Sequence, residues 1–111
     1  MGKNKGSDFI TGVRIWIDDM RPSPKGYIWC KTYNQAIATI NDFSHSEIEL
    51  ICFDHDISCE KTGYDIAKYI VENNIKLKFF SIHSQNIVGA RNIRHLLTHY
   101  GYKEVWSKLI K

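Results

Sequence analysis

The chain has 111 residues, of which 43% are hydrophobic and 13% aromatic, and its formal net charge is +3. This length suits one ordinary domain, and the composition supplies a hydrophobic core, which excludes an intrinsically disordered chain. The mild charge forms no nucleic-acid-binding stripe, and no apolar run approaches the length of a membrane span. The three cysteines, Cys30, Cys52 and Cys59, form no C-x-x-C pair. They favour a reducing, cytoplasmic setting over a disulfide framework.

The first third of the chain predicts two strands separated by a loop. Residues 1–12 indicate a polar, flexible tail, and we expect the domain itself over residues 13–111. Residues 13–17 are β-branched and aromatic, which is typical of a strand. Two prolines and a glycine over 21–26 predict a loop, and residues 27–30 predict a short second strand.

The rest of the chain alternates between helical and extended patterns. The predicted elements are a helix over 32–43, a strand over 48–53, a helix from Thr62 to Asn73, a strand over 77–82 and a helix over 87–100. Gly101 is the expected stop of the last helix. Residues 102–111 are ambiguous, because Val105 and Trp106 suit either a last strand or a helix.

Alternation of strands and helices implies βαβ units and a parallel sheet. The sequence therefore predicts the α/β class, as a single-domain, three-layer αβα sandwich. We expect a flavodoxin-like, doubly wound parallel sheet of four to five strands with helices on both faces.

Three of the predicted strands run directly into polar clusters. These clusters are Asp18-Asp19, Asp54-His55-Asp56 and His83-Ser84-Gln85-Asn86. The carboxyl ends of parallel strands meet at one edge of the sheet, where open α/β sheets bind their ligands. We therefore expect all three clusters to contribute to one site.

The carboxylates of these clusters predict a metal site. Asp18 and Asp19 are adjacent, and two neighbouring carboxylates repel each other unless a cation or a proton relieves the repulsion. Mg²⁺ prefers one or two carboxylates together with water and phosphate oxygens. We expect Asp18, Asp19, Asp54 and Asp56 to hold Mg²⁺ or another divalent cation. The alternative is that one aspartate of the first pair caps a turn while the other is solvated.

The two histidines of the clusters suit proton transfer near neutral pH. His55 and His83 follow different strands, so a convergent pair would supply both an acid and a base. The alternative for either residue is a hydrogen-bonded histidine that only orders its loop.

Neutral donors and arginines near the clusters suit a phosphate. Ser84 and Asn86 immediately precede the last helix, whose start presents free amides to an anion. Either residue is also a suitable helix N-cap. Arg21 and Arg91 could neutralise phosphate charge, although both would be ordinary as surface residues.

The order of these motifs resembles the receiver domain of two-component signalling. The resemblance places the acidic pair at Asp18 and Asp19, the phosphoacceptor at Asp54 and the hydroxyl residue at Ser84. Three features depart from that pattern. Residues 19–27 are too short and proline-rich for the usual first helix, no lysine matches the usual fifth-strand position, and the acceptor is followed by histidine and aspartate.

These departures resemble the cyclic-phosphate processing receiver-like domains. The segments that carry the resemblance are Ile17-Asp18-Asp19-Met20-Arg21-Pro22, Phe53-Asp54-His55-Asp56, Thr62-Gly63-Tyr64-Asp65 and His83-Ser84-Gln85-Asn86 with Gly89 and Asn92. The resemblance implies a receiver-like fold and chemistry on a cyclic phosphate. It also adds Asn92 to the expected phosphate-binding residues.

These observations lead to a first functional hypothesis and two alternatives. The first is a metal-assisted phosphoesterase for a 2′,3′-cyclic phosphate of an RNA end or nucleotide, with His55 and His83 as acid and base. Its partners would be a phosphate-bearing small molecule or an RNA end, with no membrane and no DNA-binding motif. The alternatives are a signalling receiver phosphorylated on Asp54 and a non-catalytic module that binds a nucleotide or a protein.

Overall fold

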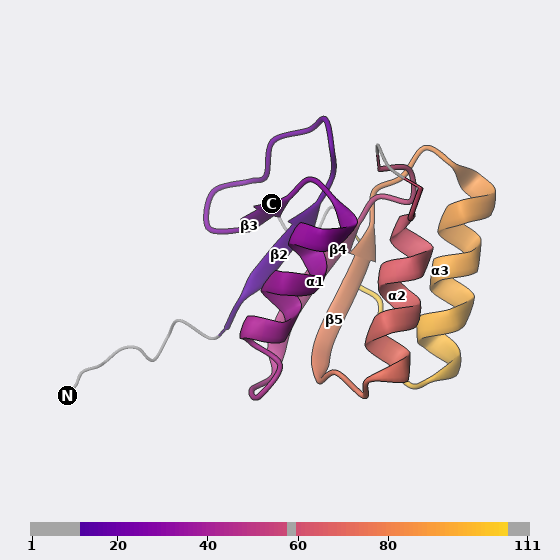
Figure 1. Cartoon of the computed structure of the whole chain (residues 1–111). Helices are drawn as coiled ribbons and strands as arrows, with labels where there is room; N and C mark the ends of the chain where they lie inside the picture. The colour runs from indigo at the N-terminus through magenta and orange to yellow at the C-terminus, as the bar shows by residue number, and fades with distance from the viewer. Residues whose placement is uncertain (1–11, 58–59, 107–111) are drawn as a thin grey trace.

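A computed structural model describes residues 12–57 and 60–106, and it contains one parallel sheet. Residues 1–11, 58–59 and 107–111 therefore lie outside the described part. The strands are β2 (Arg14–Ile17), β3 (Ile28–Cys30), β4 (Ile48–Phe53) and β5 (Leu77–Ile82). They lie in the order β3-β2-β4-β5, and every neighbouring pair is parallel (Figure 1).

Three helices connect or follow these strands, and each begins at a polar cap. They are α1 (Tyr33–Asp42), α2 (Gly63–Glu72) and α3 (Ile87–His99). Thr32, Thr62 and Asn86 each accept a hydrogen bond from a backbone amide of the first turn. Such caps satisfy amides that have no partner within the helix. Gly101 follows α3 with φ +91, a conformation that favours glycine, as expected of a helix stop.

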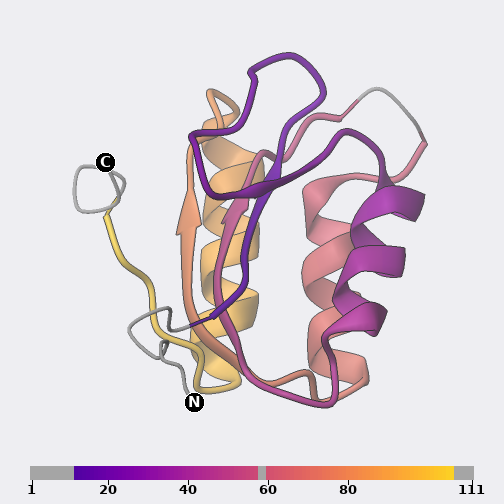
Figure 2. The same ribbon diagram turned by 90° about the vertical axis from the view of Figure 1, so that its left-hand side faces the viewer.

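The three helices form one layer, and they cover one face of the sheet (Figure 2). The connections through α1 and α2 both carry the chain in the same direction across the sheet, from β3 to β4 and then to β5. Right-handed crossovers in one direction place their helices on the same face. The α/β class and the parallel sheet are therefore confirmed. The second helical layer of the expected sandwich is not present among the described residues.

The reason lies in the connection from β2 to β3, which runs in the opposite direction across the sheet. A helix there would cover the other face, but Pro22 and Pro24 fall in a span that has no helix. Tyr27, at the end of this loop, instead packs edge-on against Trp16, with ring centroids 6.0 Å apart. Burial on this face also raises the pKa of the Cys52 thiol to about 11, so Cys52 is an inert, buried side chain.

The main core lies between the sheet and the helix layer. Alternate strand residues such as Ile15, Ile51 and Phe80 are fully buried there, together with Ile70 of α2 and Ile93 of α3. Each such side chain contributes about 1.5–3 kcal/mol through its removal from water. This packing holds the strand ends in place and so supports the polar edge described below.

The segment after α3 extends the sheet at the free edge of β5. The amide of Phe80 donates to the carbonyl of Lys103, and the amide of Val105 donates to the carbonyl of Phe80. Glu104 thus forms a parallel bridge with Phe80, and its carboxylate pairs with Arg94 of α3 through two hydrogen bonds of 2.7 and 2.9 Å. The segment is thus strand-like at one isolated bridge, and neither a regular strand nor a helix is present in residues 102–106.

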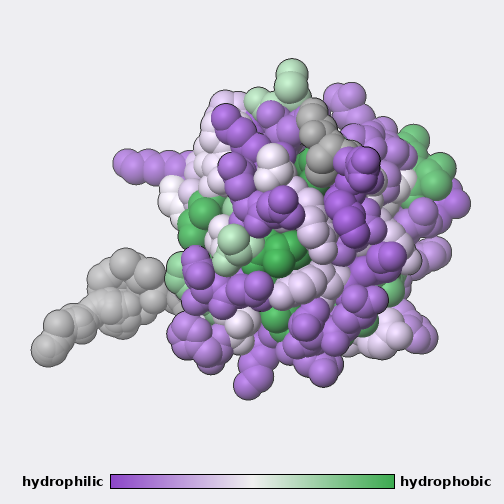
Figure 3. All heavy atoms as spheres, in the orientation of Figure 1, coloured by the Kyte–Doolittle hydropathy of each residue, from purple (hydrophilic) through white to green (hydrophobic). Residues whose placement is uncertain are grey.

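The outer surface carries no membrane-spanning element in the described ranges. No helix there combines the length and the apolar character needed to cross a membrane. Hydrophilic side chains dominate the face drawn in Figure 3, with apolar residues scattered among them.

Candidate active site

The carboxyl ends of β2, β4 and β5 bring Asp18, Asp54 and His83 together. The amide of Asp54 donates to the carbonyl of Ile17, and the amide of His83 donates to the carbonyl of Phe53. These bonds continue the sheet ladder by one step and align the three strand ends. One potential ligand atom from each of the three side chains lies within 4.8 Å of the others. We call these three residues the edge cluster.

Asp18 is nearly inaccessible to solvent, and both of its carboxylate oxygens are engaged. Oδ1 accepts from the amides of Met20 and Arg21, at 2.8 and 2.7 Å. Oδ2 lies 3.1 Å from Nε2 of His83. One oxygen therefore caps a turn, as the alternative reading of the sequence allowed, while the other faces the edge cluster.

His83 is held rigidly in the edge cluster. Its ring stacks on Trp16, with centroids 4.1 Å apart and an interplanar angle of 4°. Its carbonyl accepts from Nη1 of Arg21 at 3.2 Å. Burial lowers the pKa of the His83 imidazole, although Asp18 and Asp54 oppose this shift. Nδ1 is buried and has no hydrogen-bond partner among the described residues.

Asp54 is the most accessible carboxylate of the edge cluster. Burial raises its pKa, and a hydrogen bond with Ser84 acts in the opposite direction. Its Oδ1 also accepts from the amide of Asp56 at 3.4 Å. The side chain is thus partly positioned by its neighbours but can still receive a further ligand.

His55 lies outside the edge cluster, against the start of α3. Its Nδ1 is 2.7 Å from Oδ1 of Asp56, and Nδ2 of Asn86 donates to both Asp56 oxygens at 3.2 and 3.4 Å. A Cβ on Gly89 would lie 2.3 Å from Cγ of His55, so the ring occupies space that only a glycine leaves free. Hydrogen bonds from His55 and Asn86 lower the pKa of Asp56. We call His55, Asp56 and Asn86 the helix-start cluster.

An open pocket of about 310 Å³ lies at this edge of the sheet. Its lining residues are Asp18, Asp19, Met20, Arg21, Asp54, Asp56 and Gln85. All four predicted metal ligands therefore border one pocket. Asp19 and Asp56, however, do not belong to the group of donor atoms that could meet at a single ion.

The residues predicted to bind phosphate lie partly at this pocket and partly on or just before α3. Oδ1 of Asn86 accepts from the amide of Gly89 at 2.8 Å, so Asn86 is the N-cap of α3. Ser84 Oγ accepts from the amide of Asn86 at 3.0 Å. Arg91 is exposed on α3, and within the described ranges no contact joins it to the edge cluster.

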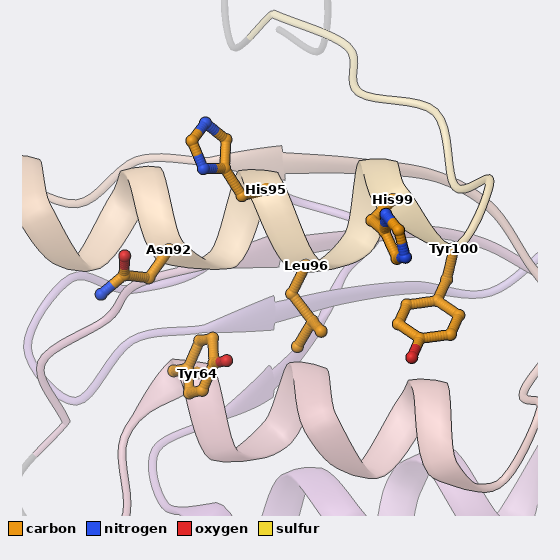
Figure 4. Close-up of a pocket in the computed structure, with 6 residues that line it drawn as sticks. All are labelled: Tyr64, Asn92, His95, Leu96, His99 and Tyr100. Carbon is orange, nitrogen blue, oxygen red and sulfur yellow. The ribbon is translucent and has the colours of Figure 1, made fainter.

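Asn92 lies in a separate groove between α2 and α3 (Figure 4). This groove has a volume of about 450 Å³, larger than that of the pocket at the sheet edge. Its residues are Tyr64, Asn92, His95, Leu96, His99 and Tyr100. The two histidines do not converge in Figure 4, and no carboxylate lines the groove. The larger volume of this groove therefore does not make it the candidate active site.

Comparison with known families now identifies the chain. A family model described as the cyclic-phosphate processing receiver domain matches residues 13–99. The chain belongs to this family. Searches among curated proteins and among solved structures give no match. Membership of the cyclic-phosphate processing receiver family confirms the resemblance and the receiver-like fold.

The edge cluster of this family member fits a divalent cation. Two carboxylates and one imidazole provide three donor atoms in close proximity, and the pocket leaves room for water or phosphate oxygens. The sequence assigned His83 to proton transfer and did not predict that it would lie beside these two carboxylates as a third possible donor. The sequence contained one indication of this proximity. His83 follows β5 directly, and β5 lies next to β4, the strand that precedes Asp54.

Proposed function

We propose that this protein is a phosphoesterase that opens a cyclic phosphate, such as the 2′,3′-cyclic phosphate of a nucleotide or an RNA end. The observation that carries the proposal is the contact of His55 with Asp56, because Asp56 borders a pocket that could hold a cation. Membership of the cyclic-phosphate processing receiver family supports the substrate class.

The reaction needs a base and a source of protons. A water oxygen forms a bond to phosphorus, and the bond from phosphorus to one ring oxygen breaks. The electron pair of that bond remains on the ring oxygen, which then takes a proton. The attacking water loses one proton to a base, and the product is a phosphate monoester.

His55 is the proposed base. A carboxylate only accepts hydrogen bonds, so the bond to Asp56 places the proton of a neutral His55 on Nδ1. Nε2 then carries the lone pair that takes a proton from water. Asp56 would act as a positioning residue that holds this tautomer and stabilises the imidazolium.

The second proton transfer does not need His83 in this proposal. The Nε2 atom of His83 already bonds Asp18, and its side chain is only 8% exposed. The departing ring oxygen would instead take its proton from water in the open pocket. The proposal thus modifies the hypothesis that both histidines transfer protons.

Asp18 and Asp54 would hold the divalent cation, for which the sequence predicts Mg²⁺. Such an ion stabilises negative charge on phosphoryl oxygens when it is bound. Arg21 and Gln85 line the same pocket and would donate hydrogen bonds that orient the phosphate.

Hydrolysis of a 2′,3′-cyclic nucleotide, followed by ³¹P NMR, tests the proposal. We expect His55→Ala to lower kcat by about 10²–10⁴-fold, the usual contribution of a general base. His45→Ala is the matched control, because His45 is an exposed histidine that belongs to neither cluster. Full activity of His55→Ala, with the native fold verified by circular dichroism, would refute the assignment of the base.

A phosphorylated signalling receiver is the second candidate, and the surroundings of Asp54 favour it. This carboxylate is half-buried beside Asp18 and bonded to Ser84. Incubation with acetyl phosphate and Mg²⁺, followed by intact-mass measurement, distinguishes the candidates. A phosphoryl adduct that disappears in Asp54→Asn would support the receiver, whereas the phosphoesterase proposal expects no stable adduct.

A further inference from the structure

We propose that the edge cluster binds a divalent first-row transition-metal ion in preference to Mg²⁺, with Nε2 of His83 as a ligand beside Asp18 and Asp54. This inference deepens the proposed function by naming the metal class. The role of the ion in turnover rests on the proposed function, but the metal preference itself does not.

The donor spacing suits one small ion. Nε2 of His83 and Oδ2 of Asp18 are 3.1 Å apart, and the donor of Asp54 lies within 4.8 Å of both. Ligands at about 2.1 Å from a common ion are separated by about 3.0 Å at octahedral angles and about 3.4 Å at tetrahedral angles. Two of the donors already have a suitable separation, and a small rotation of the more accessible Asp54 would bring in the third.

His83 is preorganised as a ligand. The stack on Trp16 fixes the ring, and the backbone amide of His83 is fixed by its bond to Phe53. With a side chain that is 8% exposed, His83 has little freedom to lose when an ion binds. An ordinary surface histidine would have to give up its rotamer freedom.

In the metal-free protein, Nε2 of a neutral His83 carries the ring proton, because the carboxylate of Asp18 that it contacts only accepts hydrogen bonds. The partner of one ring nitrogen normally determines which nitrogen carries the proton. Nδ1 of His83 is buried without a partner among the described residues. An ion between His83 and Asp18 would replace the hydrogen bond between them, and the proton would move from Nε2 to Nδ1, which accepts no hydrogen bond from a described group. The lone pair of Nε2 would then face the ion.

The chemistry of the donor set selects the metal class. Imidazole suits Zn²⁺, Co²⁺, Fe²⁺ and Ni²⁺, whereas Mg²⁺ prefers oxygen ligands and retains several waters. A set with only carboxylates would leave Mg²⁺ as the natural choice. The replacement of one oxygen ligand by the nitrogen of His83 shifts the preference toward a transition metal. The open pocket beside the cluster provides further coordination positions for water or phosphate.

Calorimetric titration of the full chain with Co²⁺, Zn²⁺ and Mg²⁺ tests this inference without any substrate. We expect one Co²⁺ or Zn²⁺ per chain, bound at least about 100-fold more tightly than Mg²⁺. His83→Gln should weaken Co²⁺ binding by more than about 100-fold, because even partners behind the ligands cost 10–100-fold. The same variant should change Mg²⁺ binding far less. Asp54→Asn should weaken the binding of both metals.

The matched control removes the other histidines that could attract a metal. His95 and His99 are exposed and four residues apart on α3, so each chain has a second, weaker candidate for Co²⁺. His95→Gln/His99→Gln should retain the tight site and its stoichiometry. Loss of tight binding in this variant would overturn the assignment to the edge cluster.

A measurement on the wild-type protein gives a test that does not depend on whether the variants fold. Co²⁺ bound at His83 should quench the fluorescence of Trp16, which stacks on that ring, and should show a visible ligand-field spectrum. Mg²⁺ binding as tight as Co²⁺ binding, or unaltered Co²⁺ binding by His83→Gln, would overturn the inference. If the protein binds Co²⁺ tightly but does not open the cyclic phosphate, only the proposed function is refuted. If it opens the cyclic phosphate but binds Mg²⁺ more tightly than Co²⁺, only this inference is refuted.

Discussion

The edge cluster and the helix-start cluster each contain a histidine beside an aspartate, yet the two pairs differ in almost every physical respect. In the edge cluster, Asp18 and His83 are nearly buried, and the contact joins Nε2 to a carboxylate across 65 residues of sequence. In the helix-start cluster, the contact joins Nδ1 of His55 to the adjacent Asp56, whose side chain is 67% exposed. The first pair is suited to rigid ligation, and the second to proton exchange with solvent.

The comparison teaches that residue type and position at a strand end do not define a role. Burial lowers the pKa of His83, whereas hydrogen bonds from His55 and Asn86 lower the pKa of Asp56. Desolvation of a histidine is therefore the largest cause of the shift in the edge cluster, and hydrogen bonding to an aspartate is the largest cause of the shift in the helix-start cluster.

The largest expected difference between the clusters is in stability. Asp18→Ala should lower the free energy of unfolding by about 3–5 kcal/mol, because it leaves buried donors without their partner. Asp56→Ala should cost less than about 1 kcal/mol, because its carboxylate is largely solvated. Urea denaturation of both variants measures the difference, and equal costs would contradict the contrast between the clusters.

A smaller effect is expected from a methyl group at the helix start. Gly89→Ala would place a Cβ against the His55 ring and displace it. We expect about a tenfold loss of ring-opening activity, equivalent to 1.4 kcal/mol. Co²⁺ binding at the edge cluster should be unchanged. Asn92→Ala, on the same helix, is the control, and full activity of Gly89→Ala would show that the position of His55 is unimportant.

Asn86 allows helix capping to be separated from its contact with Asp56. Asn86→Ala should lower the free energy of unfolding by about 1 kcal/mol through loss of the N-cap of α3. Asn86→Ser should retain most of the cap while it removes the Nδ2 donor to Asp56. Thermal denaturation and the ring-opening assay together compare the two variants. Equal activity in both would exclude a contribution of the capping bond to the orientation of His55.

The smallest expected effect is a pH dependence of stability that belongs to His83. Its folded-state pKa lies below the usual 6.5, so the unfolded chain binds more protons near this pH. The metal-free protein should therefore lose stability as the pH falls from 7.5 through 6.5, and His83→Gln should reduce this slope. Asp54, whose pKa is raised, contributes with the opposite sign at more acidic pH. Urea midpoints across this range, with His45→Gln as control, measure the effect. A slope in His83→Gln equal to that of the wild type would refute the assignment.

Local patterns in the sequence predicted the elements well. The strands at 48–53 and 77–82 have the predicted bounds, because each is a compact apolar run between polar segments. Thr62 caps α2 as expected, since its side chain and that of Asp65 satisfy each other's backbone amides. These features depend on interactions within a few residues, which a sequence displays directly.

The arrangement of the site could be predicted only in part. Parallel strands made it possible to expect that residues after β2, β4 and β5 would share one edge. The sequence left open whether Ser84 or Asn86 would cap α3, and it could not determine that Asn92 would face the groove between α2 and α3. The second outcome depends on how α3 rotates as it packs against α2 and the sheet.

The sequence by itself determined the family, the α/β class and the residues available at the sheet edge, because motifs and hydrophobic periodicity are local. Only the tertiary structure decided that helices cover one face of the described sheet, that His83 joins Asp18 and Asp54, and that His55 stands with Asp56 against Gly89. The physical reason is that strand register and helix packing bring together residues far apart in the chain. Burial and hydrogen bonding then give chemically identical side chains different properties.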